Sequence, residues 1–392
     1  MSRRRRSDVV VVGGGVVGAA CALALARLDL AVELVEAAAP PAWSADRPDL
    51  RVYAFAPDNA GLLDGLDIWR GVRESRAQPY RRMRVRDAGG GGELMFDADA
   101  LGREVLGWIV EHGLLVDRLW AALPQAGVQV RCPARVEALE QDADGVMLRL
   151  DDGGRIAARL AIAADGADST LRQLAGIGVA AHDYGQRGVV AYVATERSHE
   201  DTAWQRFLPG GPLAFLPCAD GSSSIVWTLP AAEATSVAAL DDDAFGAAVT
   251  NAFDARLGPV RPLSKRVAFP LRRQLAEREV DGRVLVLGDA AHVVHPLAGQ
   301  GVNLGLRDVA ALRDTVAEAQ RRDGDWTAPQ RLQRWARRRH SENSVAAWSF
   351  DGINRLFSND ALLPTLLRGP LLGAAGRMPP LVAALWRRAA GG

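Results

Sequence analysis

The stretch DVVVVGGGVVGAACALALARLDLAVELVE, residues 8–36, sets the fold of the first part of the chain. Asp8–Val12 is a short apolar run, rich in β-branched residues, of the kind that is buried on both faces of a parallel sheet. An alanine- and leucine-rich helix is expected from about Val16 to Leu28, and a second strand over Ala31–Glu36. The sequence therefore predicts a strand–helix–strand unit with a glycine-rich first turn.

Three glycines of this turn, Gly13, Gly15 and Gly18, have the spacing GxGxxG, and Glu36 ends the second strand. Glycine is needed where the backbone turns tightly and where a pyrophosphate approaches it, while the helix N-terminus supplies amide donors and a favourable dipole. Glu36 can accept hydrogen bonds from both hydroxyls of an adenosine ribose. A tight packing turn would not explain Glu36. The motif therefore predicts a bound dinucleotide, without separating FAD from NAD.

A second glycine-rich segment, GDAAHVVHPLAGQGVNLGLRD at residues 288–308, follows an expected buried strand at Arg283–Leu287. Asp289 at the strand end can accept hydrogen bonds from the hydroxyls of a ribityl chain. The glycines allow backbone amides, and the N-terminus of a helix near Gln300, to approach a flavin ring. Reduced flavin is anionic, and the helix dipole stabilises it. This segment therefore favours FAD.

The third motif is Asp165-Gly166-x-x-Ser169-x-x-Arg172, which follows an expected strand at Leu160–Ala164. Taken alone, it is equally typical of a capped turn before a helix.

The segment at residues 288–308 resembles the second FAD fingerprint of the class A flavoprotein monooxygenases, which share the para-hydroxybenzoate hydroxylase-like fold. Its part HPLAGQGVNLGLRD resembles the signature of the ubiquinone-biosynthesis hydroxylase family. The resemblance extends from Asp8 to Gly392, strongly at the two FAD motifs and weakly through residues 180–270. It implies an α/β fold, in which a Rossmann-like FAD-binding domain carries an inserted antiparallel β-sheet substrate domain and a helical C-terminus.

The resemblance also implies individual contacts with FAD. Arg51 would lie near the pyrophosphate and the flavin, Val136 would bond adenine through its backbone, and Asp165 would contact FAD and assist transient NAD(P)H binding. His112 stands where the family often has Arg, Gln or Asn, so a helix-cap histidine at the surface is the alternative. The complete predicted set is Gly13, Gly15, Gly18, Glu36, Arg51, His112, Val136, Asp165, Gly288, Asp289, Pro296, Gly299, Gln300, Gly301, Val302 and Asn303.

The implied reaction is hydroxylation of a polyprenylated phenol or benzoquinol ring in ubiquinone biosynthesis, through a flavin hydroperoxide formed with NAD(P)H and O₂. No second nucleotide fold is predicted, so NAD(P)H would bind only transiently, and no catalytic side chain is assigned. One alternative is an FAD-dependent hydroxylase of another aromatic substrate, catabolic or antibiotic-tailoring. The other is a non-catalytic flavoprotein of a biosynthetic assembly. The resemblance also implies other ubiquinone-biosynthesis proteins as partners.

The length of 392 residues suits joined domains. Between about Gly185 and Pro270, alternating apolar and polar residues predict an antiparallel sheet. The expected divisions are residues 1–180 for the first part of the FAD-binding domain, with small β inserts, 181–275 for the substrate sheet, 276–325 for the second part of the FAD-binding domain, and 326–392 for a C-terminal helical region.

Composition excludes several classes of function. With 47 basic and 47 acidic residues, the chain has no net charge to favour nucleic acid. The three cysteines have no metal-ligand spacing, and His292 and His295 lack a distant third ligand, so no metal is expected. Glycines interrupt the apolar stretch behind the N-terminal arginines, which argues against a signal peptide or membrane helix. The three distant cysteines are typical of structural thiols in a reducing cytoplasm.

The C-terminal segment, residues 361–392, has four arginines, no acidic residue and several leucine pairs. Such a segment can lie at an anionic membrane surface, with the protein peripheral at the inner face of the cytoplasmic membrane. A contact with another subunit or domain is the alternative. The first interpretation would suit a lipophilic aromatic substrate.

Overall fold

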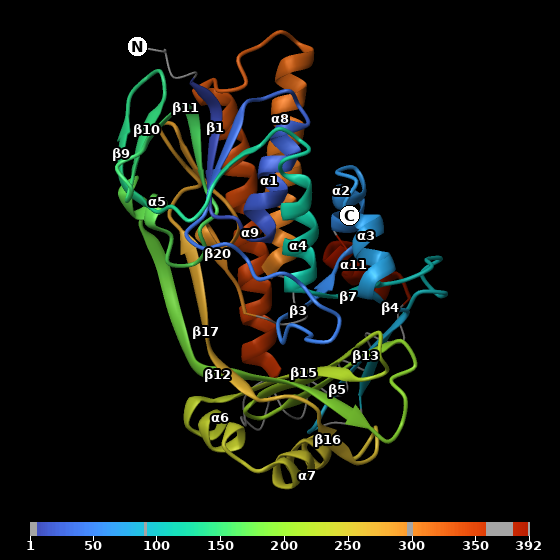
Figure 1. The fold of residues 1–392 in the computed structure, drawn as a ribbon. Helices are drawn as coiled ribbons and strands as arrows, with labels where there is room; N and C mark the ends of the chain where they lie inside the picture. The colour runs from blue at the N-terminus through green and yellow to red at the C-terminus, as the bar shows by residue number, and fades with distance from the viewer. Residues whose placement is uncertain (1–5, 90–91, 296–300, 358–378, 391–392) are drawn as a thin grey trace.

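A parallel sheet forms around β1 in the computed structural model, which describes residues 6–89, 92–295, 301–357 and 379–390 (Figure 1). Val9, Val10 and Val11 are completely buried, because this strand has neighbours on both sides and layers on both faces. In order, the sheet consists of β18 (Val280–Asp281), β19 (Val284–Val286), β11 (Arg155–Ala163), β1 (Ser7–Val12), β2 (Val32–Val35) and β8 (Gln129–Arg131), with β10 (Val146–Leu150) and β9 (Val136–Gln141) extending it from β11.

Helices cover one face of this sheet, and α1 is their centre. Nearly all of its side chains are buried, because it packs between the sheet, α4 and α8. Gly305 of α8 permits a close approach, since a Cβ there would lie 2.7 Å from the side chain of Val17. The helices of this layer and its surroundings are α1 (Val16–Ala26), α2 (Pro57–Asp64), α3 (Trp69–Arg76), α4 (His112–Ala122), α8 (Gly301–Arg321) and α9 (Pro329–Phe357). Near the second and third motifs lie α5 (Thr170–Leu174) and the 3₁₀ turn η1 (Gly288–Ala290).

A second, nine-stranded sheet lies beyond the open end of the first, and the long strands β12 and β17 connect the two regions (Figure 1). Its strands are antiparallel except where β13 runs parallel to β5. The order is β20 (His292–Val293), β17 (Val267–Ala276), β12 (Val179–Thr195), β15 (Ser223–Pro230), β14 (Gly211–Pro217), β13 (Thr202–Leu208), β5 (Arg82–Asp87) and β6 (Glu93–Asp97), with β16 (Val260–Pro262) beside β12. Its outer face packs against α6 (Ala231–Ala238) and α7 (Asp242–Ala252).

A small third sheet joins the two regions and consists of β3 (Val52–Phe55), β7 (Gly107–Glu111) and β4 (Gln78–Tyr80). The last described element is α11 (Pro379–Ala390). Its Val382 is buried in a cluster with Val85, Leu94 and Phe207 of the nine-stranded sheet. Within the described ranges, no helix combines the length and apolar character that a membrane crossing requires.

The structure has the predicted α/β fold with an antiparallel sheet and C-terminal helices. Small β inserts were expected before residue 180, but not their place in the second sheet. Strands β5 and β6 precede residue 100 but belong to the nine-stranded sheet, because β5 pairs with β13 in parallel. Because the second sheet contains strands from before residue 180, the domain boundaries at residues 180, 275 and 325 stay a proposal.

Candidate functional site

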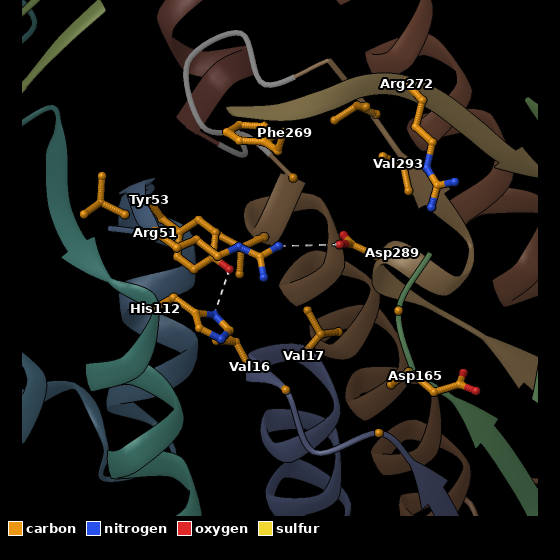
Figure 2. Close-up of a pocket in the computed structure, with 18 of the residues that line it drawn as sticks. Val16, Val17, Arg51, Tyr53, His112, Asp165, Phe269, Arg272, Asp289 and Val293 are labelled. Carbon is orange, nitrogen blue, oxygen red and sulfur yellow. Dashed lines mark hydrogen bonds and ion pairs between the residues drawn. The ribbon is translucent and has the colours of Figure 1, made fainter. Parts of the chain in front are cut away.

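A cavity of about 1000 Å³ lies between the open end of the parallel sheet and the inner face of the nine-stranded sheet. The turn after β1, the end of β2 and the start of α8 line one side of it, and β12, β14, β15 and β17 line the other. Ligands in open α/β sheets bind at the carboxyl ends of the strands, which is where this cavity lies. Figure 2 shows Arg51, Asp289 and His112 around it.

The glycines of the first motif shape the turn between β1 and α1. Gly13 has a φ of +105°, and a Cβ there would lie 2.3 Å from the carbonyl oxygen of Ala164. A Cβ on Gly18 would lie 2.0 Å from the carbonyl oxygen of Gly13, so this glycine serves helix–strand packing. Gly15 faces the cavity, and α1 begins there without a side-chain cap. The first amides of α1 therefore form a site suited to a pyrophosphate.

Glu36 fixes the same turn from the end of β2. Its carboxylate accepts hydrogen bonds from the backbone N–H of Gly14 at 2.6 Å and of Ala38 at 3.1 Å. The indole of Trp120 donates to the carbonyl oxygen of Gly14 at 2.6 Å. A carboxylate has about four acceptor positions, so Glu36 can still accept from ribose hydroxyls in the cavity that it lines.

Asp289 and Arg51 face each other across the cavity (Figure 2). The Arg51 Nη2 and Asp289 Oδ2 atoms are 4.0 Å apart, and both side chains are partly exposed to the cavity. The positive φ of Gly288, +60°, turns the chain so that Asp289 faces inward. The two charges are placed to bind the polar middle part of a dinucleotide.

Buried polar groups hold this turn from behind. Asp308 accepts hydrogen bonds from the backbone N–H of Gly288 at 3.0 Å, His292 Nε2 at 2.6 Å, Arg339 Nε at 2.7 Å and Asn343 Nδ2 at 3.1 Å. Burial alone would raise the pKa of Asp308, but His292, Arg339 and Asn343 lower that pKa to about 2. Burial opposes the charge of His292, but Asp308 outweighs this effect and raises the pKa of the imidazole. The group is a compensated ion cluster in the core.

His112 begins α4 and lies in the cavity wall. Its Nδ1 is 2.9 Å from the hydroxyl of Tyr53, which also lines the cavity. Burial lowers the pKa of His112, and Arg51 lowers it further. The neutral ring accepts from Tyr53 at Nδ1 in this assignment, so Nε2 can donate to a ligand. The structure thus places His112 at the cavity, whereas the alternative was a surface cap.

The third motif forms a capped turn beside the cavity. Asp165 accepts from the hydroxyl of Ser169 and from the N–H of Leu171 at 3.1 Å, while Ser169 Oγ caps the N–H of Arg172 at 3.0 Å. Arg172 donates to the carbonyl oxygen of Ala290 at 2.9 Å, which connects this motif to the second one. The capping interpretation therefore describes the Asp165 side chain, although the residue also lines the cavity.

The structure brings most of the predicted residues together. Those that line the cavity are Gly13, Gly15, Glu36, Arg51, His112, Val136, Asp165, Asp289, Gly301 and Val302. Gly18, Gly288 and Asn303 lie behind this lining. Asn303 is completely buried, and its amide binds Ala54, Ala56 and Asn59, so the side chain fastens α8 to β3 and α2. Pro296, Gly299 and Gln300 lie outside the described residues.

Sequence reasoning missed Tyr53 and the cavity face of the nine-stranded sheet. The period-2 alternation of those strands was visible, but not which of the two faces is covered by helices. No cluster of three or more His, Cys, Asp or Glu side chains with the form of a metal site occurs among the described residues.

Comparison with known proteins agrees with this geometry. Residues 6–344 match a family model described as an FAD binding domain. The chain is 40% identical to 3-demethoxyubiquinol 3-hydroxylase from Escherichia coli over 354 residues, which cover 90% of each protein. The chain belongs to the ubiquinone-biosynthesis hydroxylase family of class A FAD-dependent monooxygenases.

One further relative agrees with this assignment, and two solved structures have the same fold. The hydroxylase is 32% identical to the human mitochondrial ubiquinone biosynthesis monooxygenase COQ6, over 95% of this chain and 90% of that protein. The crystal structure of p-nitrophenol 4-monooxygenase PnpA from Pseudomonas putida has the same fold, with a TM-score of 0.79 at 19% identity and 98% of each chain covered. A structure of HpxO from Klebsiella pneumoniae with FAD and uric acid matches with a TM-score of 0.75 at 20% identity, again over 98% of each chain.

The hydroxylase is therefore an oxidoreductase with FAD as its cofactor and NAD(P)H as its co-substrate. The residues present fit FAD, because the uncapped N-terminus of α1 suits its pyrophosphate and the Glu36 carboxylate suits a ribose. We propose that Asp289 and Arg51 bind the part of FAD between the adenosine and the flavin, and that His112 contacts FAD through Nε2.

Proposed function

We propose that this enzyme hydroxylates a polyprenylated phenol or benzoquinol ring in the biosynthesis of ubiquinone. The observation that carries the proposal is a continuous cavity, which joins the FAD motifs to an inner sheet face made mainly of apolar side chains. Relatives named 3-demethoxyubiquinol 3-hydroxylase and ubiquinone hydroxylase UbiL support this substrate class.

The protein's contribution to this reaction is binding, orientation and exclusion of water. When bound and reduced by NAD(P)H, FAD activates O₂ for oxygen transfer to an electron-rich ring. The side chains of Val190, Ala214, Val226 and Phe269 form an apolar wall across the cavity from the α1 turn. This wall keeps water from the reacting atoms and leaves room for an aromatic ring with an apolar tail.

Two measurements test the proposed function. A strain lacking this gene should accumulate a prenylated quinone precursor that lacks one ring hydroxyl or its methylated product, as mass spectrometry would show. Purified enzyme with FAD should oxidise NAD(P)H faster when a short-chain benzoquinol is added, and should release the hydroxylated ring. Bound FAD without substrate-stimulated turnover would identify a non-catalytic flavoprotein instead.

We further propose that the enzyme reaches its lipid substrate at an anionic membrane surface through residues 361–392. In the described part of this segment, α11, Val382 is buried against the nine-stranded sheet and the guanidinium of Arg103 lies 5.3 Å from the ring centre of Trp386. Arg387 is exposed on the same helix. One side of α11 thus packs against the rest of the protein, which supports a domain contact there. Another side carries the positive charge of Arg387 towards solvent.

Reversing the charge at Arg368, Arg377 and Arg387 to Glu should abolish salt-sensitive binding to vesicles of anionic phospholipid. Each arginine near such a surface contributes about 1 kcal/mol of attraction. Turnover of a long-chain quinol in vesicles should fall, while turnover of a short-chain, water-soluble quinol should persist. The matched control reverses three arginines of α8 and α9, namely Arg321, Arg334 and Arg337. If the first variant still cosedimented with vesicles like the unaltered enzyme, residues 361–392 would serve only as a contact with another domain.

A further inference from the structure

The inner face of the nine-stranded sheet is defined by alternation along its strands. Successive side chains of a strand point to opposite faces. Val189, Phe215 and Trp227 belong to the core cluster under α6 and α7. Their neighbours in sequence, Val190, Ala214, Val226 and Thr228, line the cavity. The wall that faces the cofactor motifs is therefore fixed by the register of these strands.

Two rows of side chains cross this wall. Pairing of neighbouring strands aligns the first row, and all its members line the cavity: Gln205, Ala214, Val226, Val190 and Val267. The next row contains Thr228, Gly188 and Phe269, which are aligned in the same way. Gln205 and Thr228 thus belong to adjacent rows and lie two strands apart, about 10 Å at the usual strand spacing.

Gln205 and Thr228 are the uncharged polar side chains that this sheet contributes to the cavity lining. Gln205 is 7% exposed and Thr228 is 2% exposed. No hydrogen bond within the described residues engages either side chain, and both residues line the cavity, so their polar atoms are free to bind a ligand there. The charged group of the same wall, Arg272, is already paired with Asp168 at 2.8 Å. Gln205 and Thr228 are therefore placed to form hydrogen bonds with a ligand in the cavity.

Two glycines allow close packing around Thr228 and Phe269. A Cβ on Gly211, whose φ is +139°, would lie 2.6 Å from Thr228 Cγ2, so the threonine methyl packs under a bare backbone. A Cβ on Gly188 would lie 2.8 Å from Phe269 Cζ, so the phenyl ring lies over β12 in the row of Thr228. Figure 2 shows Phe269 across the cavity from Val16 and Val17 of α1. An aromatic face thus lies close to a fixed hydroxyl.

We propose that Gln205 and Thr228 bind the oxygen substituents of the substrate ring and so determine which ring carbon faces the flavin. This inference rests on the proposed function and adds the residues that recognise the ring. An amide and a hydroxyl can each donate and accept, as the hydroxyls and ether oxygens of a quinol require. Neither is charged, and Arg272 is already paired, so the wall selects a neutral phenol or quinol over an aromatic acid.

The test uses FAD-loaded enzyme and a short-chain benzoquinol. Thr228→Val and Gln205→Leu should each weaken substrate binding about 3- to 10-fold, as expected for one lost hydrogen bond. Binding is measured by titration of the flavin absorbance. The product formed per NAD(P)H consumed should also fall, because a misoriented ring is hydroxylated less often. FAD content should stay unchanged. Ser224→Ala is the control, since Ser224 is a buried residue of β15 with an unbonded hydroxyl and does not line the cavity.

A second ligand separates recognition from a general change in the sheet. The second ligand is an analogue in which hydrogen replaces one oxygen substituent of the ring. One of the two variants should bind this analogue as tightly as the unaltered enzyme does. Equal losses for both ligands, equal losses in Ser224→Ala, or unchanged binding and coupling in both variants would overturn the inference. Failure of the proposed function would show separately, as absence of a hydroxylated quinol with the unaltered enzyme.

Discussion

Asp289→Ala should give a folded protein that purifies largely without flavin. Asp289 supplies the carboxylate at the cavity end of the second motif, and Gly288 aims it inward. Its side chain is 44% exposed, so the substitution leaves no cavity in the core. Removing an acceptor from the hydroxyl groups of a bound ligand leaves those groups unpaired, which costs about 1–3 kcal/mol and more where charge is involved.

The measurement is the flavin absorbance of the purified protein, followed by titration of the apoprotein with FAD. Asp289→Asn keeps one acceptor oxygen, so its FAD affinity should lie between that of Asp289→Ala and that of the unaltered enzyme. Asp314→Ala removes an exposed carboxylate from α8 and should keep its flavin. A full yellow spectrum with unchanged FAD affinity in Asp289→Ala would show that this carboxylate does not bind the cofactor.

The first FAD motif could be predicted because its chemistry is local. The turn that contains Gly13 and Gly15 joins neighbouring elements, and the strand that ends in Glu36 follows directly. Each requirement is met by residues within thirty positions of one another, so spacing alone indicates the site. The second motif has the same character from Arg283 to Gly301.

The unpredicted parts depend on distant pairs. Tyr53 meets His112 across 59 positions, and β5 pairs with β13 across more than one hundred. Nothing local in β13 or β15 shows that Gln205 and Thr228 line the cavity, because this depends on which sheet face α6 and α7 cover. Asn303 shows the converse: it lies inside a recognisable motif, yet its amide is committed to β3 and α2.

Asp308 lies within the second motif, but its partner Arg339 lies 31 positions later in the sequence, so the pair could be predicted only in part. Asp308→Asn should lower the free energy of unfolding by about 3–5 kcal/mol, the usual effect of breaking a buried ion pair from one side. Arg339 and His292 are both almost completely buried and would lose their carboxylate partner. The backbone N–H of Gly288 would also lose a charged acceptor, so FAD affinity should fall as well.

Urea denaturation at a fixed FAD concentration measures this effect, because bound FAD itself stabilises the folded state. The control is Asp314→Asn on the same helix, where the exposed side chain should change the free energy by less than about 0.5 kcal/mol. If Asp308→Asn is too unstable to purify, Asn343→Ala removes one neutral hydrogen bond from the same carboxylate. That variant should lose about 0.5–1.5 kcal/mol.

The cluster also predicts a pH dependence. Because the pKa of His292 is raised in the folded state, its contribution to stability is complete below its ordinary pKa near 6.5 and is lost as the pH rises through the raised value. The pKa of Asp308 is lowered to about 2, so its contribution is present above about pH 4 and is lost as the pH falls towards 2. The unaltered enzyme should therefore lose stability above pH 6.5, and Asp308→Asn should lose less over the same range. Equal slopes in both proteins would mean that His292 does not titrate against Asp308.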